Sequence, residues 1–165
     1  MDRSIAIGGF MGVGKSTVGR RVAARIGAPF VDLDTEIERR TNQTVAKVFA
    51  EVGEAEFRRL ETETLASVIE RGWSVVALGG GTLHQESNRE LLKGRADVLV
   101  LWASYEAIAA RLDERDDGSR PLWPDAPRLW LERREGYRSF GTLVDVEGLD
   151  PDAAAVAVVE ALPWF

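Results

Sequence analysis

Short apolar runs alternate with amphipathic stretches along most of the chain. Residues 4–7 form a largely apolar run that leads into a glycine-rich turn. After the turn, Val18, Val22 and Ile26 recur at every fourth position, as far as Gly27. This pattern predicts a strand, a loop and a helix that ends at a glycine.

Further apolar runs predict further strands. Each run is short, and the two in the middle of the chain are apolar throughout, which is typical of strands buried on both faces. After the run at residues 29–33, Thr35 and Glu38 have the spacing of a capping box that opens a helix. The predicted strands are residues 29–33, 75–78, 98–102 and 143–146.

Two more helices are predicted. Apolar residues follow helical spacing over residues 54–71, and Gly72 ends that run. Asp150 and Pro151 are typical of the cap and first turn of a helix that continues to Leu162. Because strands alternate with helices, we expect an α/β fold of three layers, α/β/α, around a central parallel sheet of about five strands.

Residues 113–128 interrupt this alternation. The segment holds Pro121, Pro124 and Pro127 among many charged residues, which argues against a regular core element. It is therefore predicted to be a mobile loop. Because long loops in compact domains often close over active sites, we expect this one to be a lid.

Length and composition favour one domain over residues 1–165. A chain of 165 residues that is 45% hydrophobic can bury one sizeable core. It contains no run near the roughly 18 apolar residues of a membrane span, and its start lacks a long apolar signal segment, so we expect a cytoplasmic protein. The net charge of −6 argues against broad nucleic-acid binding and favours a local anion site.

The chain has no cysteine and one histidine, His84. Disulfides, thiolate metal sites and a cysteine nucleophile are therefore excluded. A histidine zinc site or a Ser-His-Asp triad is also disfavoured. We place His84 on a loop surface and assign it no role.

Residues 9–16 carry the clearest chemical signal. They read GFMGVGKS, which matches the P-loop pattern of glycine, four residues and Gly-Lys-Ser. The glycines let the backbone aim N–H groups inward, and the following helix adds its positive end, so the loop is predicted to cradle phosphates. Lys15 is expected to reach the β- and γ-phosphates, and Ser16 is placed to bind Mg²⁺. An ordinary glycine-rich turn is the alternative, and the flanking strand and helix argue against it.

Asp32 and Asp34 come at the end of the second predicted strand. Because they are two residues apart, their side chains are predicted to emerge on the same side. Parallel sheets bind ligands at the carboxyl ends of their strands. One carboxylate could hold the water shell of a metal, and the other could accept a proton from an attacking hydroxyl. The pattern alone also allows Asp34 to cap the next helix while Asp32 is solvated.

Other features are ambiguous when the residues are considered singly. The three glycines at residues 79–81 follow a strand, and they suit either a close backbone approach to a substrate or a plain tight turn. Arg58 lies four residues after Glu54 and three before Glu61, the spacing of a surface ion-pair ladder.

In combination, these motifs resemble those of the shikimate kinase family, from about Ile5 to the last predicted helix. The P-loop, the two aspartates, FRRLE at residues 57–61, the glycine triplet and RPL at residues 120–122 occur in the family's order. The series is more specific than a P-loop alone. The resemblance implies a P-loop kinase-like fold with a mobile lid, and transfer of the γ-phosphoryl group of ATP to the 3-hydroxyl of shikimate.

The resemblance also implies residue roles. Lys15, Asp34 and Arg120 would be catalytic, with Asp34 as the base and Arg120 reaching the phosphates from the lid. Ser16 would bind Mg²⁺ directly, and Asp32 would bind it through water. The nucleotide would contact Gly12, Val13, Gly14, Lys15, Ser16, Thr17, Arg111 and Arg120, and the acceptor would contact Asp34, Phe57, Arg58, Gly79, Gly80, Gly81 and Arg133.

The lid carries Trp123 and Trp130 where the family commonly has smaller aliphatic residues, and a second departure from the family pattern concerns the carboxylate clamp. Where the family usually has Arg-x-Pro-Leu-Tyr, residues 133–137 read RREGY, so Arg133 or Arg134 could complete a carboxylate clamp with Arg58. Glu61 would orient Arg58, which gives the apparent surface ladder a second interpretation.

Two other classes compete with this assignment. A gluconate kinase shares the P-loop and also binds a polyhydroxy acid, whereas Phe57, Arg58 and the triple glycine favour shikimate. A GTPase or nucleotide sensor lacks support because the chain has no Asn-Lys-x-Asp segment, which would recognise guanine. In addition, the strand at residues 75–78 leads into glycines and not into the metal-binding aspartate expected of many P-loop ATPases and GTPases. We expect ATP, shikimate and Mg²⁺ as ligands, a monomer, and no nucleic-acid or membrane partner.

Overall fold

A parallel sheet of five strands lies at the centre of the computed structural model, which describes residues 3–112 and 122–164. The strand order is β2-β3-β1-β4-β5, and every neighbouring pair is parallel. The prediction of an α/β fold around a parallel sheet is therefore confirmed. The strands are β1 (Ser4–Gly9), β2 (Phe30–Asp32), β3 (Val75–Ala77), β4 (Ala96–Trp102) and β5 (Thr142–Asp145).

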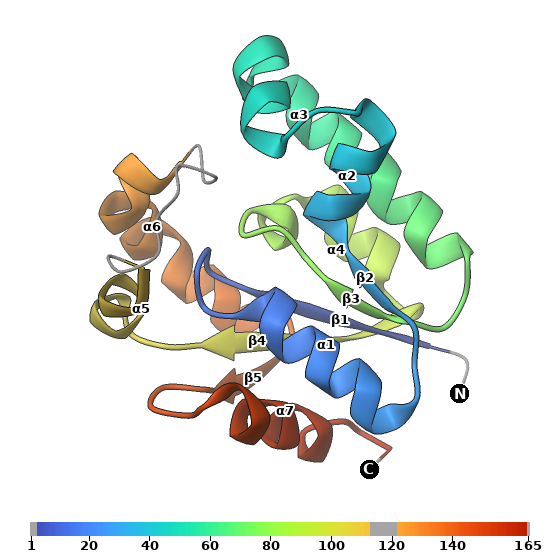
Figure 1. The fold of residues 1–165 in the computed structure, drawn as a ribbon, viewed down its shortest axis with the longest axis vertical. Helices are drawn as coiled ribbons and strands as arrows, with labels where there is room; N and C mark the ends of the chain where they lie inside the picture. The colour runs from blue at the N-terminus through green and yellow to red at the C-terminus, as the bar shows by residue number, and fades with distance from the viewer. Residues whose placement is uncertain (1–2, 113–121, 165) are drawn as a thin grey trace.

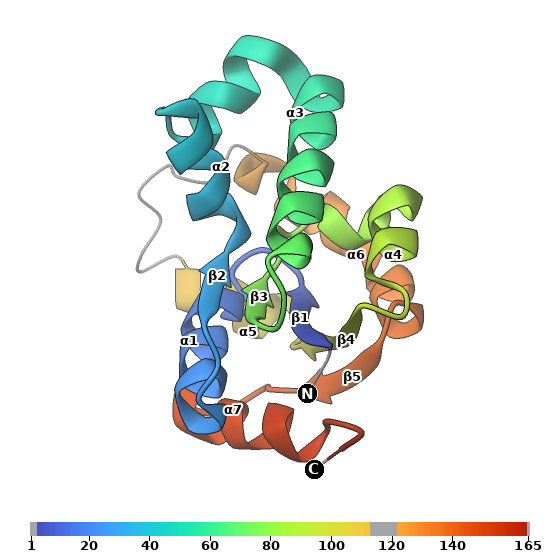
Figure 2. The same ribbon diagram turned by 90° about the vertical axis from the view of Figure 1, so that its right-hand side faces the viewer.

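Helices cover both faces of this sheet (Figure 1 and Figure 2). The helices α1 (Lys15–Ile26) and α7 (Pro151–Glu160) pack together on one face. On the other side lie α3 (Val45–Glu70), α4 (Glu86–Leu92) and α6 (Ala126–Ser139). The remaining elements are α2 (Leu33–Thr41), α5 (Tyr105–Leu112) and the 3₁₀ turns η1 (Thr82–His84) and η2 (Trp123–Asp125).

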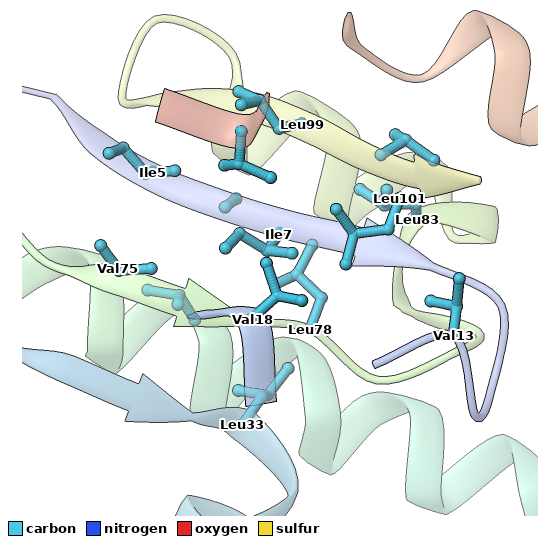
Figure 3. Packing of buried hydrophobic residues seen from close by; sticks show 14 of the residues in the cluster. Ile5, Ile7, Val13, Val18, Leu33, Val75, Leu78, Leu83, Leu99 and Leu101 are labelled. Atoms are coloured by element: carbon cyan, nitrogen blue, oxygen red, sulfur yellow. The ribbon is translucent and has the colours of Figure 1, made fainter. Parts of the chain in front are cut away.

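The central strand β1 is buried along its whole length, as expected of a strand with sheet on both sides and helices on both faces. Ile7 lies in register with Ala77 of β3 and Leu99 of β4. Figure 3 shows Val13 of the P-loop and Leu83 of η1 among the same buried side chains. The loops at the carboxyl edge of the sheet are thus anchored in the core.

The start of α2 differs from the prediction. Asp32 is the N-cap, and its Oδ1 accepts hydrogen bonds from the backbone N–H groups of Asp34, at 3.1 Å, and Thr35, at 3.3 Å. The capping box predicted at Thr35 and Glu38 is therefore wrong. The Glu38 carboxylate instead accepts a hydrogen bond from the N–H of Val45, at 2.9 Å.

The helix predicted over residues 54–71 is confirmed as the second part of α3. The earlier turns, from Val45, were not predicted. At Gly53 the backbone has φ 78° and ψ 172°, a conformation outside the helical region that glycine adopts readily, and α3 is kinked there. The first turns of α3 and the helix α2 extend away from the sheet at the top of Figure 1.

The predicted loop over residues 113–128 extends too far. Its last residues belong to η2 and to the first turn of α6, which begins at Ala126. Pro127 suits this place because the first turn of a helix does not need its N–H. Residues 113–121, which include Arg120, lie outside the described residues.

His84 does not lie on a loop surface as predicted. It is half-buried in η1, with its ring edge-on to Tyr137 at 4.8 Å and to Phe140 at 5.0 Å between centroids. Burial, assisted by the nearby charge of Arg133, lowers the pKa of His84 to about 4. Among the helices of residues 3–112 and 122–164, none has the length and apolar character to cross a membrane.

Candidate active site

The P-loop takes the shape that its glycines predict. Gly9, Gly12 and Gly14 all have positive φ, between 80° and 133°. Gly14 is the N-cap of α1 and supplies no side-chain acceptor, so the first N–H groups of the helix are available to an anion. Lys15 is buried beside the loop, and its Nζ donates a hydrogen bond to the carbonyl oxygen of Phe10, at 2.9 Å. This geometry is suited to surround a phosphate group.

A cavity of about 330 Å³ opens over this loop. Its walls include all the described residues predicted to contact nucleotide, and Arg111 reaches from α5 to donate a hydrogen bond to the carbonyl of Val13, at 3.4 Å. Among the apolar wall residues that the sequence analysis did not select, four lie between the end of β5 and the first turn of α7, where the sequence gave only signals for a strand and a helix. These are Val146, Leu149, Pro151 and Ala154, beside the predicted Gly12, Val13, Gly14, Lys15, Ser16 and Thr17.

Ser16 and Asp32 meet at the edge of this cavity. The Ser16 hydroxyl donates a hydrogen bond to Oδ2 of Asp32, while the other carboxylate oxygen of Asp32 caps α2. The alternative in which Asp34 caps the helix and Asp32 is solvated is therefore wrong. A hydroxyl and a carboxylate from two elements, beside a phosphate cradle, form the oxygen-rich donor set that suits Mg²⁺. Within the described residues, no group of three or more His, Cys, Asp and Glu side chains could hold a metal ion.

Asp34 lies in the first turn of α2 and lines both this cavity and a second one. Solvent reaches Asp34 from the cleft, but protein atoms lie close around its carboxylate on the other sides. This partial withdrawal from water and the neighbouring Asp32 carboxylate raise the pKa of Asp34 to about 6, against the opposing charge of Lys15. A carboxylate with such a pKa is suited to accept a proton near neutral pH.

The second cavity, of about 100 Å³, adjoins the first. The two share Met11, Asp34 and Gly80 as wall residues. The glycine triplet therefore lines a cavity and is more than a plain turn. The predicted acceptor residues Asp34, Phe57, Arg58, Gly79, Gly80, Gly81 and Arg133 all lie in its walls, together with Val45, Phe49, Glu61 and Leu122.

Arg58 is held at the wall of this second cavity. Its Nη1 donates to Oε2 of Glu61 at 2.9 Å, and the two side chains are only 12% and 1% exposed. Its pair with Glu54, at 3.6 Å, is looser and reaches solvent. The surface-ladder interpretation is therefore wrong for the pair with Glu61. Gly81 makes this position possible, because a Cβ there would lie 2.5 Å from Nη2 of Arg58.

The structure distinguishes Arg133 from Arg134. Arg133 lines the second cavity, and its buried Nη1 has no hydrogen-bond partner among the described residues. Arg134 is 45% exposed, pairs with Glu135 at 3.7 Å and lies over the ring of Trp130. Of the two, only Arg133 offers an unused donor in the cavity region.

Tyr137 is a residue that the sequence analysis did not select. It is buried, donates a hydrogen bond to the carbonyl oxygen of Gly80 and stands edge-on to Phe10 of the P-loop, at 6.5 Å between ring centroids. Burial raises its pKa, against the charge of nearby Arg133. Its position at the end of the segment at residues 133–137 was the available signal.

Comparisons of the sequence give a consistent result. The sequence model of the family described as shikimate kinase matches residues 11–163. The shikimate kinase of Thermus thermophilus is 37% identical over 164 residues, which cover 96% of this chain and 89% of the relative. That of Dictyoglomus turgidum is 31% identical, with 98% of each chain covered.

Solved structures share the fold. A shikimate kinase from Acinetobacter baumannii in complex with shikimate has a TM-score of 0.85 at 34% identity and covers 97% of this chain and 91% of its own. A gluconokinase from Sinorhizobium meliloti has a TM-score of 0.69 at 21% identity, over 97% of this chain and 91% of its own. The second likeness concerns the fold alone.

Proposed function

The chain belongs to the shikimate kinase family of ATP-dependent phosphotransferases, and we propose that it transfers the γ-phosphoryl group of ATP to the 3-hydroxyl of shikimate. The observation that carries the proposal is the common wall of the two cavities. A phosphate cradle and a smaller cavity beside two arginines meet at Asp34 and Gly80. A phosphate donor and an anionic acceptor bound there would face each other across Asp34.

The proposed roles follow from the chemistry of the transfer. The P-loop N–H groups and Lys15 would bind the phosphates and stabilise the charge that spreads over the transferred group. Asp34 would accept the proton of the attacking hydroxyl. Arg58 and Arg133 would bind the carboxylate of the acceptor, because guanidinium groups match its geometry. Positioning and charge neutralisation would supply most of the rate.

Magnesium is part of the proposal. Ser16 would bind the ion through its hydroxyl, and Asp32 would bind it through water. When bound, the ion neutralises negative charge on the β- and γ-phosphates. The existing contact between Ser16 and Asp32 supports this assignment, because it brings the hydroxyl and the carboxylate to one side of the cradle.

The lid and the assembly complete the proposal. We expect Arg120 to contact the phosphates when the lid closes, which would exclude water and suppress ATP hydrolysis. We also expect a single domain that works as a monomer in the cytoplasm. Sedimentation of the purified protein with and without ATP tests the oligomeric state, and a dimer would contradict it.

The direct test is an ADP-release assay with shikimate and gluconate compared side by side. We expect release that depends on shikimate, and turnover that prefers gluconate would contradict the assignment. Lys15→Met should abolish turnover, because it removes the charge from the cradle. Lys47→Met is the matched control, since Lys47 is exposed on α3 and pairs with Glu51 at 3.9 Å.

A further inference from the structure

The carboxylate of Glu61 joins Arg58, in the wall of the smaller cavity, to Thr82, which follows the glycine triplet. Its Oε2 accepts a hydrogen bond from Nη1 of Arg58 at 2.9 Å, and its Oε1 accepts one from the hydroxyl of Thr82 at 2.7 Å. Glu61 is 1% exposed and Thr82 is fully buried. The two oxygens therefore depend on protein donors, because solvent does not reach them.

Thr82 is itself held firmly. It begins η1 directly after the glycine triplet, and its N–H donates to the carbonyl of Gly79 at 3.2 Å. Its own carbonyl accepts a hydrogen bond from Nδ2 of Asn88 at 2.9 Å. Because the N–H and the carbonyl of Thr82 are both hydrogen-bonded, its backbone is fixed, and its hydroxyl donates to Glu61 from a defined position.

Gly79 leaves the space that this contact needs. A Cβ at residue 79 would lie 2.6 Å from Oε1 of Glu61 and 3.0 Å from the hydroxyl oxygen of Thr82. The first glycine of the triplet is therefore required by the hydrogen bond between the two side chains, in addition to any approach of a substrate.

We propose that Thr82 is a positioning residue for the acceptor site, which acts on Arg58 through Glu61. The proposal rests on the proposed function, because it takes Arg58 as a ligand of the acceptor carboxylate. Without the hydroxyl, Oε1 of Glu61 loses its donor in a buried place, which is costly. The carboxylate then rotates to recover a second hydrogen bond, and the guanidinium of Arg58 moves with it.

Replacement of the hydroxyl by a methyl group is the test. We expect Thr82→Val to raise the KM for shikimate roughly tenfold and to leave the KM for ATP within about twofold, as for loss of a group that orients a binding residue. Thr82→Ser keeps the hydroxyl and should restore the KM for shikimate. Thr64→Val is the control, because Thr64 is equally buried on α3 and its hydroxyl donates to the carbonyl of Leu60 at 2.8 Å.

A structural role of Thr82 gives a different result. A hydroxyl that only stabilises the fold would lower the melting temperature in Thr82→Val, without separating the two KM values. A second measurement compares Thr82→Val in the wild type and in Glu61→Gln. We expect Thr82→Val to raise the KM for shikimate less in the Glu61→Gln background than in the wild type, because Glu61, through which Thr82 acts on Arg58, is already altered there.

Several outcomes would overturn the proposal. These are an unchanged KM for shikimate in Thr82→Val, equal changes in both KM values, or failure of Thr82→Ser to restore the wild-type value. If Thr82→Val does not fold, Thr82→Ala takes its place, because it also lacks the hydroxyl. The criterion is the same: the KM for shikimate should rise while the KM for ATP stays nearly unchanged. The wild type is assayed first: no turnover with shikimate would defeat the proposed function and this role together, whereas normal turnover leaves Thr82 as the only question.

Discussion

Tyr137 donates its hydroxyl hydrogen bond to the carbonyl oxygen of Gly80, and this contact fastens α6 to the wall shared by the two cavities. The same ring stands against Phe10 of the P-loop. One buried side chain therefore touches the phosphate cradle, the glycine triplet and the helix that carries Arg133. The three parts of the site have their positions fixed relative to one another by packing and by a hydrogen bond.

Tyr137→Phe tests this contact. Loss of the hydroxyl leaves the aromatic packing intact and frees the Gly80 carbonyl, so we expect the KM for shikimate to rise roughly three- to tenfold, the scale of one hydrogen bond. The melting temperature should fall by about 2–4 °C. Steady-state kinetics and thermal unfolding measure the two effects. Ser139→Ala is the control, because that hydroxyl donates to the carbonyl of Gly136 on the exposed side of α6. Equal kinetics in wild type and Tyr137→Phe would remove Tyr137 from the site.

Gly81→Ala should disturb the acceptor site without straining the backbone. Gly81 has φ −104°, a value that alanine adopts without strain. Its new Cβ would, however, lie 2.5–2.8 Å from the guanidinium atoms of Arg58, which must move away. We expect the KM for shikimate to rise roughly tenfold or more, with the KM for ATP nearly unchanged. A variant whose KM for shikimate is unaltered would show that the position of Arg58 does not matter for binding.

Each proposed clamp arginine has a neighbour that serves as its control. Arg58→Ala and Arg133→Ala should each weaken shikimate binding by about 2–4 kcal/mol, the scale of a lost charge-assisted contact in a buried site. Arg59 and Arg134 are exposed and pair with surface glutamates, so Arg59→Ala and Arg134→Ala should have little effect. Titration calorimetry measures these affinities. A large loss in Arg134→Ala, with none in Arg133→Ala, would reverse the assignment.

Glu36 provides a prediction of pH dependence that is independent of the active site. Its carboxylate accepts hydrogen bonds from Arg39 and from Arg71, the latter from the C-terminal end of α3, and these lower its pKa from an ordinary 4.5 to about 2. Because the pKa is lower in the folded state, the stabilisation is complete above about pH 4.5 and is lost as the pH falls toward about 2.

Urea unfolding between neutral and acidic pH measures this contribution. In Glu36→Gln the free energy of unfolding should fall less steeply over that acidic range than in the wild type. Arg71→Met should show part of the same flattening, since it removes one of the two donors. Parallel pH profiles for the wild type and Glu36→Gln would contradict the lowered pKa.

The elements that the sequence predicted correctly have local signals. The P-loop, the strand before it and the helix after it follow from glycines and from apolar spacing within a few residues. The start of α2 was predicted wrongly, because two local caps compete there. Asp32 lies before the first helical residue and accepts two N–H groups, which leaves Thr35 inside the helix.

The contacts that were missed join distant parts of the chain. His84 was placed on the surface because nothing near it in sequence buries it, whereas Tyr137 and Phe140 of the α6 region do so in the fold. The difference between Arg133 and Arg134 also could not be predicted, because two adjacent arginines in a polar helix look alike. The fold separates them, because Arg133 lies on the side of α6 that faces the glycine triplet and Arg134 does not.

The common wall of the two cavities also bears on inhibition. A compound with an anionic end beside Arg58 and a phosphate mimic at the P-loop would need only a short linker past Gly80. Such a molecule would compete with both substrates at once and would gain affinity from the linkage itself. Because Gly80 has no side chain, its part of the shared wall is backbone, and a substitution there that blocked the inhibitor would also crowd the enzyme's own substrates.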